Sequence, residues 1–197
     1  MSREIKSMSD AELLAVLVGS RTAGQLLKWS GGSLCQLLHE SSLAENARPQ
    51  VAAKLAAARE LVCRSLVESM RHRDVLDSPA AVRDYLRLTI GRREYEAFTV
   101  LFLDTKHRVI ASEEMFHGTL SQASVYPREV VKRALAHNAA AIVFAHNHPS
   151  GVADPSLADE AITRSLCSAL ALLDVRVLDH LVVGGNDIVS FAERGLL

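Results

Sequence analysis

The sequence has little of what marks membrane-spanning, strongly basic or disulfide-bonded proteins. Its 197 residues include 22 lysines and arginines against 23 aspartates and glutamates, which gives a formal net charge of −1 at pH 7. Such a balance provides no overall field to attract nucleic acid or an acidic membrane. No apolar run approaches the roughly 20 residues of a membrane span, and Met1-Ser2-Arg3-Glu4 leads into no signal-like apolar region. A cytoplasmic protein without membrane contact is therefore expected.

Cysteine is also scarce. Cys35, Cys63 and Cys167 are widely spaced, and none has a C-x-x-C partner. This pattern is typical of reduced thiols that pack as small hydrophobic residues, not of a disulfide framework. With 49% hydrophobic and 23% charged residues, the composition is that of an ordinary globular protein. Its length suits one medium domain or a small domain joined to a larger one.

One stretch, residues 145–151 with the sequence A-H-N-H-P-S-G, is suited to chemistry. It follows a short apolar run that is typical of a buried strand. Because side chains at i and i+2 of a strand share a face, His146 and His148 would present two imidazoles side by side. The proline and glycine that follow would end the strand and allow a sharp turn.

A carboxylate is placed to join the two histidines. Ser156 is a good N-cap for a helix from residue 157 on, and Asp159 would lie in its first turn, close to the end of the strand. Two neutral imidazoles and one carboxylate around an open position are the ligand set of a catalytic zinc site. The same set is compatible with iron, manganese or nickel. The plainer alternative is that Ser156 and Asp159 are only a capping pair.

Two other metal-dependent classes share letters with this stretch but not its pattern. HNH nucleases take their name from residues dispersed over a ββα unit, so the adjacent triplet His-Asn-His carries no weight for a nuclease. The H-x-E and P-C-x-x-C signature of zinc deaminases is absent.

Residues 1–72 are expected to be helical. A capping box, Ser9-x-x-Glu12, precedes a leucine-rich segment. Further helices are expected over 22–29, over 33–39 and from about Pro49 onward. A boundary near residues 74–78 would separate this part from a second domain over 75–197.

The second part alternates strands and helices. A helix over 79–88 is followed by a predicted hairpin, with strands over 98–103 and 108–110. The elements expected next are a helix over 127–137, a strand over 141–148, a helix over 156–173 and strands over 175–183 and 188–191. This order predicts an α/β layer architecture, with the two histidines at the carboxyl end of a central strand.

These residues resemble a known family. The pattern H-x-H-P-S-G…P-S-x-x-D resembles the metal motif of the JAB/MPN (JAMM) metallopeptidases, and V-Y-P-R-E-V at 125–130 and L-D-H at 178–180 resemble the bacterial RadC family. The resemblance covers residues 75–197 closely and the N-terminal part more loosely. It implies an α/β (α+β) MPN/JAB1-like domain, with a cytidine-deaminase-like layered sheet and flanking helices, preceded by a small all-α helix-hairpin-helix-like domain.

The resemblance also implies site residues. His146, His148 and Asp159 would bind one Zn²⁺ per chain. Peptide hydrolysis also needs a base that carries a proton to the leaving amine. The sequence alone offers Glu94, Glu96, Glu113, Glu114 and Glu129. The resemblance points to Glu96, in the family's E-x-F at the first strand, with its neighbour Glu94 as the alternative. Ser156 matches the family serine that donates a hydrogen bond to an oxyanion, or it serves only as the helix cap.

DNA binding by the N-terminal part has little support. Its helix-hairpin-helix-like turn, residues 44–48, has no glycine and contains Glu45, which disfavours close approach of a phosphate. The basic residues of 48–73 suit a solvated helix face better than a DNA surface, and no aromatic residue lies between them.

Four further polar residues have plainer interpretations. His180 is either a hydrogen-bond partner of the site or a satisfied buried histidine, and the second interpretation is favoured. His117 and His137 are interpreted as ordinary. Asn147 points away from the two histidines and is expected to fix the loop, not to bind metal.

The sequence thus favours a cytosolic zinc metallohydrolase, a metallopeptidase or amide/isopeptide hydrolase with a peptide-like or protein substrate. One alternative is a non-catalytic metal-binding MPN module that acts with DNA or a protein partner. Another is a nuclease that uses the same metal, although the near-neutral charge and the glycine-free turn count against it.

Overall fold

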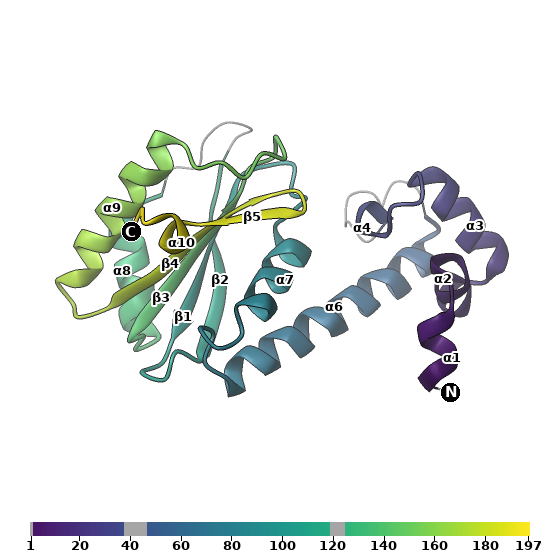
Figure 1. The fold of residues 1–197 in the computed structure, drawn as a ribbon, viewed down its shortest axis with the longest axis horizontal. Coiled ribbons are helices and arrows are strands. Elements are labelled where there is room, and N and C mark those ends of the chain that lie inside the picture. The colour runs from purple at the N-terminus through teal and green to yellow at the C-terminus, as the bar shows by residue number, and fades with distance from the viewer. Residues whose placement is uncertain (1, 38–46, 119–124) are drawn as a thin grey trace. The chain divides into compact units, whose positions relative to one another are not determined.

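The computed structural model describes residues 2–37, 47–118 and 125–197 (Figure 1). The chain divides into two compact units, Met1–Val62 and Cys63–Leu197, and the boundary falls inside a helix. The first unit contains α1 (Ser2–Ser7), α2 (Asp10–Val18), α3 (Ser20–Trp29), α4 (Leu34–Leu37) and the start of α6 (Pro49–His72). The second contains α7 (Pro79–Thr89), β1 (Ala97–Leu103), β2 (Val109–His117), α8 (Pro127–Ala136), β3 (Ala141–Asn147), α9 (Leu157–Ala171), β4 (Arg176–Gly184), β5 (Asp187–Ser190) and α10 (Phe191–Arg194). The domain limits expected from the sequence, 1–72 and 75–197, stay a prediction.

Local capping signals explain the helices of the first unit. The capping box before α2 is present, because the Ser9 amide donates to the Glu12 carboxylate at 2.7 Å and the Glu12 amide donates to the Ser9 hydroxyl at 3.4 Å. Gly19, with φ +86°, ends α2, and α3 begins directly at Ser20 instead of at Thr22. Most of the predicted helix-hairpin-helix-like turn lies outside the described residues. Where the structure describes the chain, no helix is both long and apolar enough to cross a membrane.

A five-stranded sheet in the order β2-β1-β3-β4-β5 organises the second unit. β1 is antiparallel to β2 and β3, β3 runs parallel to β4, and β5 is antiparallel to β4. Helices α8 and α9 pack against one face of the sheet and α7 against the other (Figure 1). The predicted α/β layer, with its hairpin and the histidine-bearing strand at the centre, is confirmed.

The central strand β3 is buried on both faces, and this fixes where its functional residues point. Ile142 and Phe144 belong to the apolar cluster with α8 and α9, whereas Val143 and Ala145 belong to the cluster with α7. Side chains alternate along a strand. His146 therefore continues the face covered by α8 and α9, and Asn147 continues the face covered by α7.

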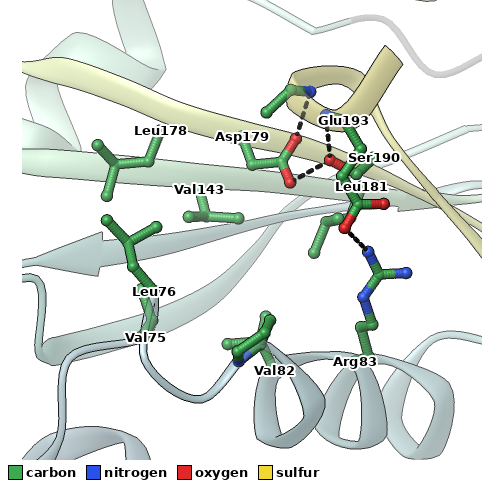
Figure 2. Close-up of a pocket in the computed structure, with 12 residues that line it drawn as sticks. Val75, Leu76, Val82, Arg83, Val143, Leu178, Asp179, Leu181, Ser190 and Glu193 are labelled. Atoms are coloured by element: carbon green, nitrogen blue, oxygen red, sulfur yellow. Dashed lines mark hydrogen bonds and ion pairs between the residues drawn. The ribbon is translucent and has the colours of Figure 1, made fainter.

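The C-terminal turn α10 was not expected from the sequence, and a partly buried carboxylate on β4 holds it in place. Asp179 accepts hydrogen bonds from the Ser190 hydroxyl at 2.6 Å and the Ala192 amide at 3.0 Å (Figure 2). It also accepts from the His180 amide at 2.7 Å. Burial raises the pKa of Asp179. A largely apolar pocket of about 250 Å³ lies beside it, on the α7 face of the sheet. Because these hydrogen bonds join β4 to Ser190 and to α10, Asp179 is interpreted as a structural residue.

Candidate metal centre

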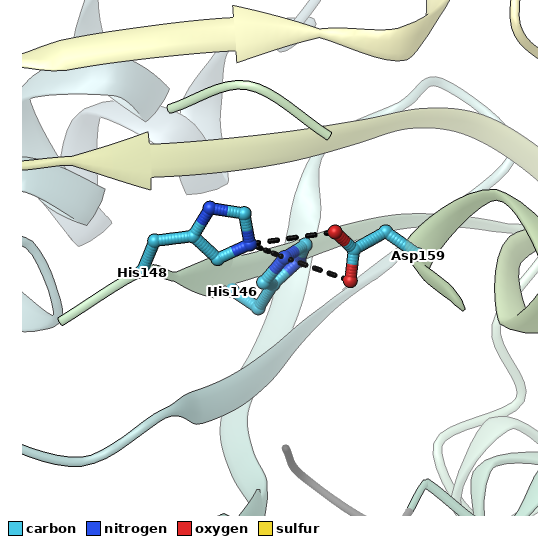
Figure 3. A group of neighbouring side chains, drawn as sticks. All are labelled: His146, His148 and Asp159. Carbon is cyan, nitrogen blue, oxygen red and sulfur yellow. Dashed lines mark hydrogen bonds and ion pairs between the residues drawn. The ribbon is translucent and has the colours of Figure 1, made fainter. Parts of the chain in front are cut away.

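Two imidazoles and a carboxylate converge where β3 ends. His146 is buried within the strand, with 1% of its surface exposed, and His148 follows the strand's last residue and is partly buried. Their Nε2 atoms lie 3.0 Å apart. The Asp159 carboxylate lies 3.3 Å from each of these nitrogens, by Oδ1 to His146 and by Oδ2 to His148 (Figure 3). The structure thus brings the three predicted ligand residues together, with one ligand atom of each within 4.8 Å of the others.

The loop after β3 sets the position of His148. The His148 amide donates to the Val183 carbonyl at 2.8 Å, and Gly151 adopts φ +80° as the chain turns. A Cβ added at Gly184 on β4 would lie only 2.4 Å from the Ala153 amide nitrogen. A residue without a side chain is therefore required at position 184 for the loop to approach β4 this closely.

The same loop selects the tautomer of His148. Its Nδ1 lies 2.8 Å from the Val152 carbonyl oxygen. A carbonyl can only accept, so Nδ1 carries the hydrogen and Nε2 of the neutral ring carries a lone pair. That lone pair faces His146 and Asp159.

A buried chain of hydrogen bonds selects the tautomer of His146. The Thr163 hydroxyl donates to the Asp159 backbone carbonyl at 2.5 Å, so its oxygen is left to accept from Nδ1 of His180 at 2.6 Å. Nε2 of His180 then accepts from Nδ1 of His146 at 2.8 Å. Burial holds the pKa of His180 well below its ordinary value, so this ring is neutral and can both donate and accept. His146 is thereby left with its lone pair on Nε2.

His180 is thus more than the satisfied buried histidine that the sequence favoured, because it directly contacts a member of the cluster. His180 is fully buried with both ring nitrogens hydrogen-bonded, as favoured, but its role as a partner of His146 was not favoured because that contact is tertiary. β4 runs parallel to β3 and pairs His180 with Phe144, which sets its ring beside the next residue of β3 on that face, His146. Thr163, on α9, was missed for the same reason. No local sequence pattern links these residues.

The charges of the cluster favour a cation at its centre. Burial alone would raise the pKa of Asp159, but the hydrogen bonds that His146 and His148 donate when their Nε2 atoms are protonated hold it well below its ordinary value. The hydrogen bond to Asp159 raises the pKa of His148, against the opposing effect of burial. Two lone pairs 3.0 Å apart beside a carboxylate repel one another unless a proton or a metal ion lies between them. The donor set can therefore hold a divalent metal ion.

Helix α9 delivers Asp159 through its first turn. The Ser156 amide and hydroxyl each donate to Asp159 Oδ2 at 2.7 Å, and the Asp159 amide donates to the Ser156 hydroxyl at 3.1 Å. This is a capping box in which the N3 residue is also the candidate ligand. Ser156 is therefore a helix cap here, and its predicted oxyanion role stays a prediction.

Of the candidate bases, Glu96 lies nearest to the cluster by register. β1 and β3 pair with Phe98 opposite His146, so continuing this antiparallel register sets Glu96 on the His148 side. After the hydrogen bond to Asp159, the charge of Glu96 is among the causes that raise the pKa of His148. Glu113, Glu114 and Glu129 form ion pairs with basic side chains outside the cluster, and Glu94 is exposed.

The two histidines interpreted as ordinary, His117 and His137, lie apart from the cluster. His137 Nε2 lies 2.6 Å from a carboxylate oxygen of Glu113, and Arg133 bonds the same carboxylate. The hydrogen bond from Arg133 lowers the pKa of Glu113 to about 2. The side chain of His117 is 62% exposed. Both histidines take part in surface ion pairs.

Comparison with known proteins identifies the family. Residues 76–196 match the family model of the RadC-like JAB domain. A UPF0758 protein of Nitrosomonas eutropha is 54% identical over 201 residues, which cover 96% of this chain and 90% of the relative. A UPF0758 protein of Leptothrix cholodnii is 54% identical over 202 residues, which cover 97% of this chain and 91% of the relative. Neither name assigns an activity. Because the family model spans more than half of the chain, the protein belongs to the RadC-like JAB-domain family.

Proposed function

We propose that the protein is a zinc-dependent metallohydrolase of the cytoplasm that cleaves an amide or isopeptide bond in a peptide-like or protein substrate. The observation that carries this proposal is the orientation of two imidazole rings. Separate hydrogen bonds at Nδ1 of His146 and Nδ1 of His148 leave a lone pair on each Nε2 atom, and both lone pairs point to one position beside Asp159. A neutral, oriented imidazole is the state that a metal ligand needs, and a hydrogen-bond acceptor behind the ring normally fixes it. Membership of the RadC-like JAB family agrees with this chemistry.

Each residue of the site has a distinct role. Zinc held by His146, His148 and Asp159 would supply a Lewis acid that makes water acidic near neutral pH. Glu96 accepts a proton from the attacking water and delivers it to the leaving amine. Ser156 caps α9 and is proposed to donate to the oxyanion of the substrate. Residues 75–197 would form this hydrolase domain, with a cytidine-deaminase-like layered sheet, and residues 1–72 a helical, degenerate helix-hairpin-helix-like domain.

A second candidate is a metal-binding module without catalysis, acting with a protein or DNA partner. The observation in its favour is that the Ser156 hydroxyl hydrogen bonds to Asp159, so it is directed at a ligand and not at a substrate. The two candidates agree on the metal and differ only in turnover.

Separating metal binding from hydrolysis tests the proposal. Glu96→Gln should keep bound zinc and lose hydrolysis of a quenched amide-linked peptide library that the wild type cleaves. Glu94→Gln is the matched control and should retain both. Equal loss of metal in Glu96→Gln and His148→Ala would contradict the division of roles. Stoichiometric zinc without cleavage by the wild type would favour the binding module.

A further inference from the structure

Asn147, the middle residue of the His-Asn-His triplet, makes an unusually complete set of contacts. It is fully buried on the α7 face. Its Oδ1 accepts from the Ala97 amide at 2.8 Å, and its Nδ2 donates to the carbonyls of Arg93 at 3.2 Å and Tyr95 at 3.1 Å. All three partners belong to the segment that leads into β1. The expectation that Asn147 fixes the loop of its own strand therefore named the wrong segment.

These hydrogen bonds take the place of backbone pairing at the point where the pairing of β1 with β3 ends. The pairs of β1 with β3 run from Leu103 opposite Ala141 to Phe98 opposite His146 and do not continue to Ala97. Beyond that point a side-chain amide supplies the acceptor and the donors that a neighbouring backbone would supply. A carboxamide suits this task because it both accepts and donates, whereas a carboxylate only accepts.

Glu96 is the residue enclosed by these bonds. Asn147 bonds the carbonyl of Tyr95 on one side of it and the amide of Ala97 on the other. On the other edge of the segment, the Glu96 carbonyl accepts from the Gly118 amide at 2.7 Å. The backbone at Glu96 is thus fixed from both edges, and the direction of its Cα–Cβ bond is fixed with it.

We propose that Asn147 is a positioning residue that holds Glu96 at the His146–His148–Asp159 cluster through the backbone on either side of it. This inference rests on the proposed function, because Glu96 matters only if the cluster holds a metal. One strand then serves the site with three consecutive residues. His146 and His148 face the metal position, and Asn147, between them, holds the backbone on either side of Glu96, the proposed base.

Two variants and two measurements test this inference. Asn147→Ala removes the three bonds. Val143→Ala is the matched control, because it truncates a buried residue on the same strand and face, opposite Leu101, and removes none of these three bonds. In metal-free protein, hydrogen exchange should show the Ala97 amide opening faster in Asn147→Ala by roughly tenfold more than the loss of global stability explains. In Val143→Ala it should follow global stability alone.

The second measurement uses Co²⁺-loaded protein and the pH midpoint of its visible absorption. Removing the negative charge of Glu96 from beside the metal should shift this midpoint down by about one pH unit in Glu96→Gln. Asn147→Ala should keep its Co²⁺ and give a shift in the same direction. The double variant should shift no further than Glu96→Gln alone. Val143→Ala should not shift.

The outcomes separate the inference from the function beneath it. An Ala97 amide that follows global stability in Asn147→Ala, or midpoint shifts that add in the double variant, would overturn the positioning role. If no variant binds Co²⁺, the proposed function fails, and the exchange measurement on metal-free protein still decides whether Asn147 holds the segment at Glu96.

Discussion

His146 and His148 present the same nitrogen to the same point, but the protein holds them by different means. His146 is fixed from the interior, by the buried chain through His180 and Thr163. His148 is fixed from the surface, by one carbonyl of the loop after β3. The interior arrangement lies in the core, because His180 and Thr163 are buried, whereas the ring of His148 is partly exposed. We infer that His146 is the pre-set ligand and His148 the adjustable one.

The largest expected effect breaks the interior arrangement. His180→Leu removes the acceptor behind His146, and the ring then loses the bond that keeps its lone pair on Nε2. Losing such a partner typically weakens metal binding by about 10- to 100-fold. Competition with a chromophoric chelator measures the zinc affinity.

Thr163→Val is the graded control for this prediction. It leaves the acceptor of His146 in place and removes the acceptor of His180, together with one hydrogen bond to the Asp159 backbone carbonyl. The loss of zinc affinity should therefore be smaller than in His180→Leu. Unchanged affinity in His180→Leu would show that the buried chain does not set the ligand.

A smaller effect is expected on the loop side. Gly184→Ala places a Cβ against the backbone of residues 151–153 and so displaces the carbonyl that orients His148. Because the ring of His148 is partly exposed and is oriented by a single carbonyl, zinc affinity should fall by no more than about tenfold, below the loss in His180→Leu. Chelator competition and thermal unfolding measure both consequences. Gly24→Ala, in a helix with open space at its Cβ, is the control that should leave zinc affinity unchanged and should not lower the unfolding temperature. A larger loss in Gly184→Ala than in His180→Leu would reverse the assignment of the two histidines.

The smallest effect is the pH dependence of the metal-free protein. Because the pKa of Asp159 is lowered in the folded protein, its carboxylate stabilises the fold above pH 3.8, the ordinary pKa of the group. This stabilisation is lost as the pH falls below that value. Because the pKa of His148 is raised in the folded protein, its protonated ring stabilises the fold below pH 6.5, the ordinary pKa of the group. This stabilisation is lost as the pH rises through the pKa of the folded state. Between these limits the pair should contribute on the order of 1 kcal/mol.

Urea unfolding of metal-free wild type and Asp159→Asn measures this contribution. The difference in unfolding free energy should be largest between pH 3.8 and 6.5 and should shrink above that window. With added zinc, the stability of the wild type should instead increase as the pH rises, because the ligands must lose protons to bind the metal. A difference that grows steadily to pH 9 without metal would contradict the paired charges.

The same contrast explains what could be predicted from the sequence. The strand before His146, the cap at Ser156 and the place of Asp159 follow from local patterns, namely an apolar run, a Pro/Gly loop and S-x-x-D. These patterns were sufficient to predict the sheet's central strand and the residues that converge at its end.

The supporting residues could not be predicted in this way. The contact of His180 with His146 depends on the parallel pairing of β3 with β4, and that of Asn147 with residues 93–97 depends on the end of the β1–β3 ladder. Both are tertiary, and neither leaves a local signal. The start of α3 at Ser20 was missed because a positive-φ glycine sets it, and the turn α10 was missed because the partly buried carboxylate of Asp179 holds it.

Metal analysis tests the central claim most directly. The protein is purified without a chelator or a histidine tag, beside the double variant His146→Ala/His148→Ala, and its metals are counted by elemental analysis. We expect about one zinc per chain in the wild type, by analogy with single-metal catalytic sites, and none in the variant. A wild type that holds no metal even after incubation with zinc would contradict the metal centre and the hydrolase built on it.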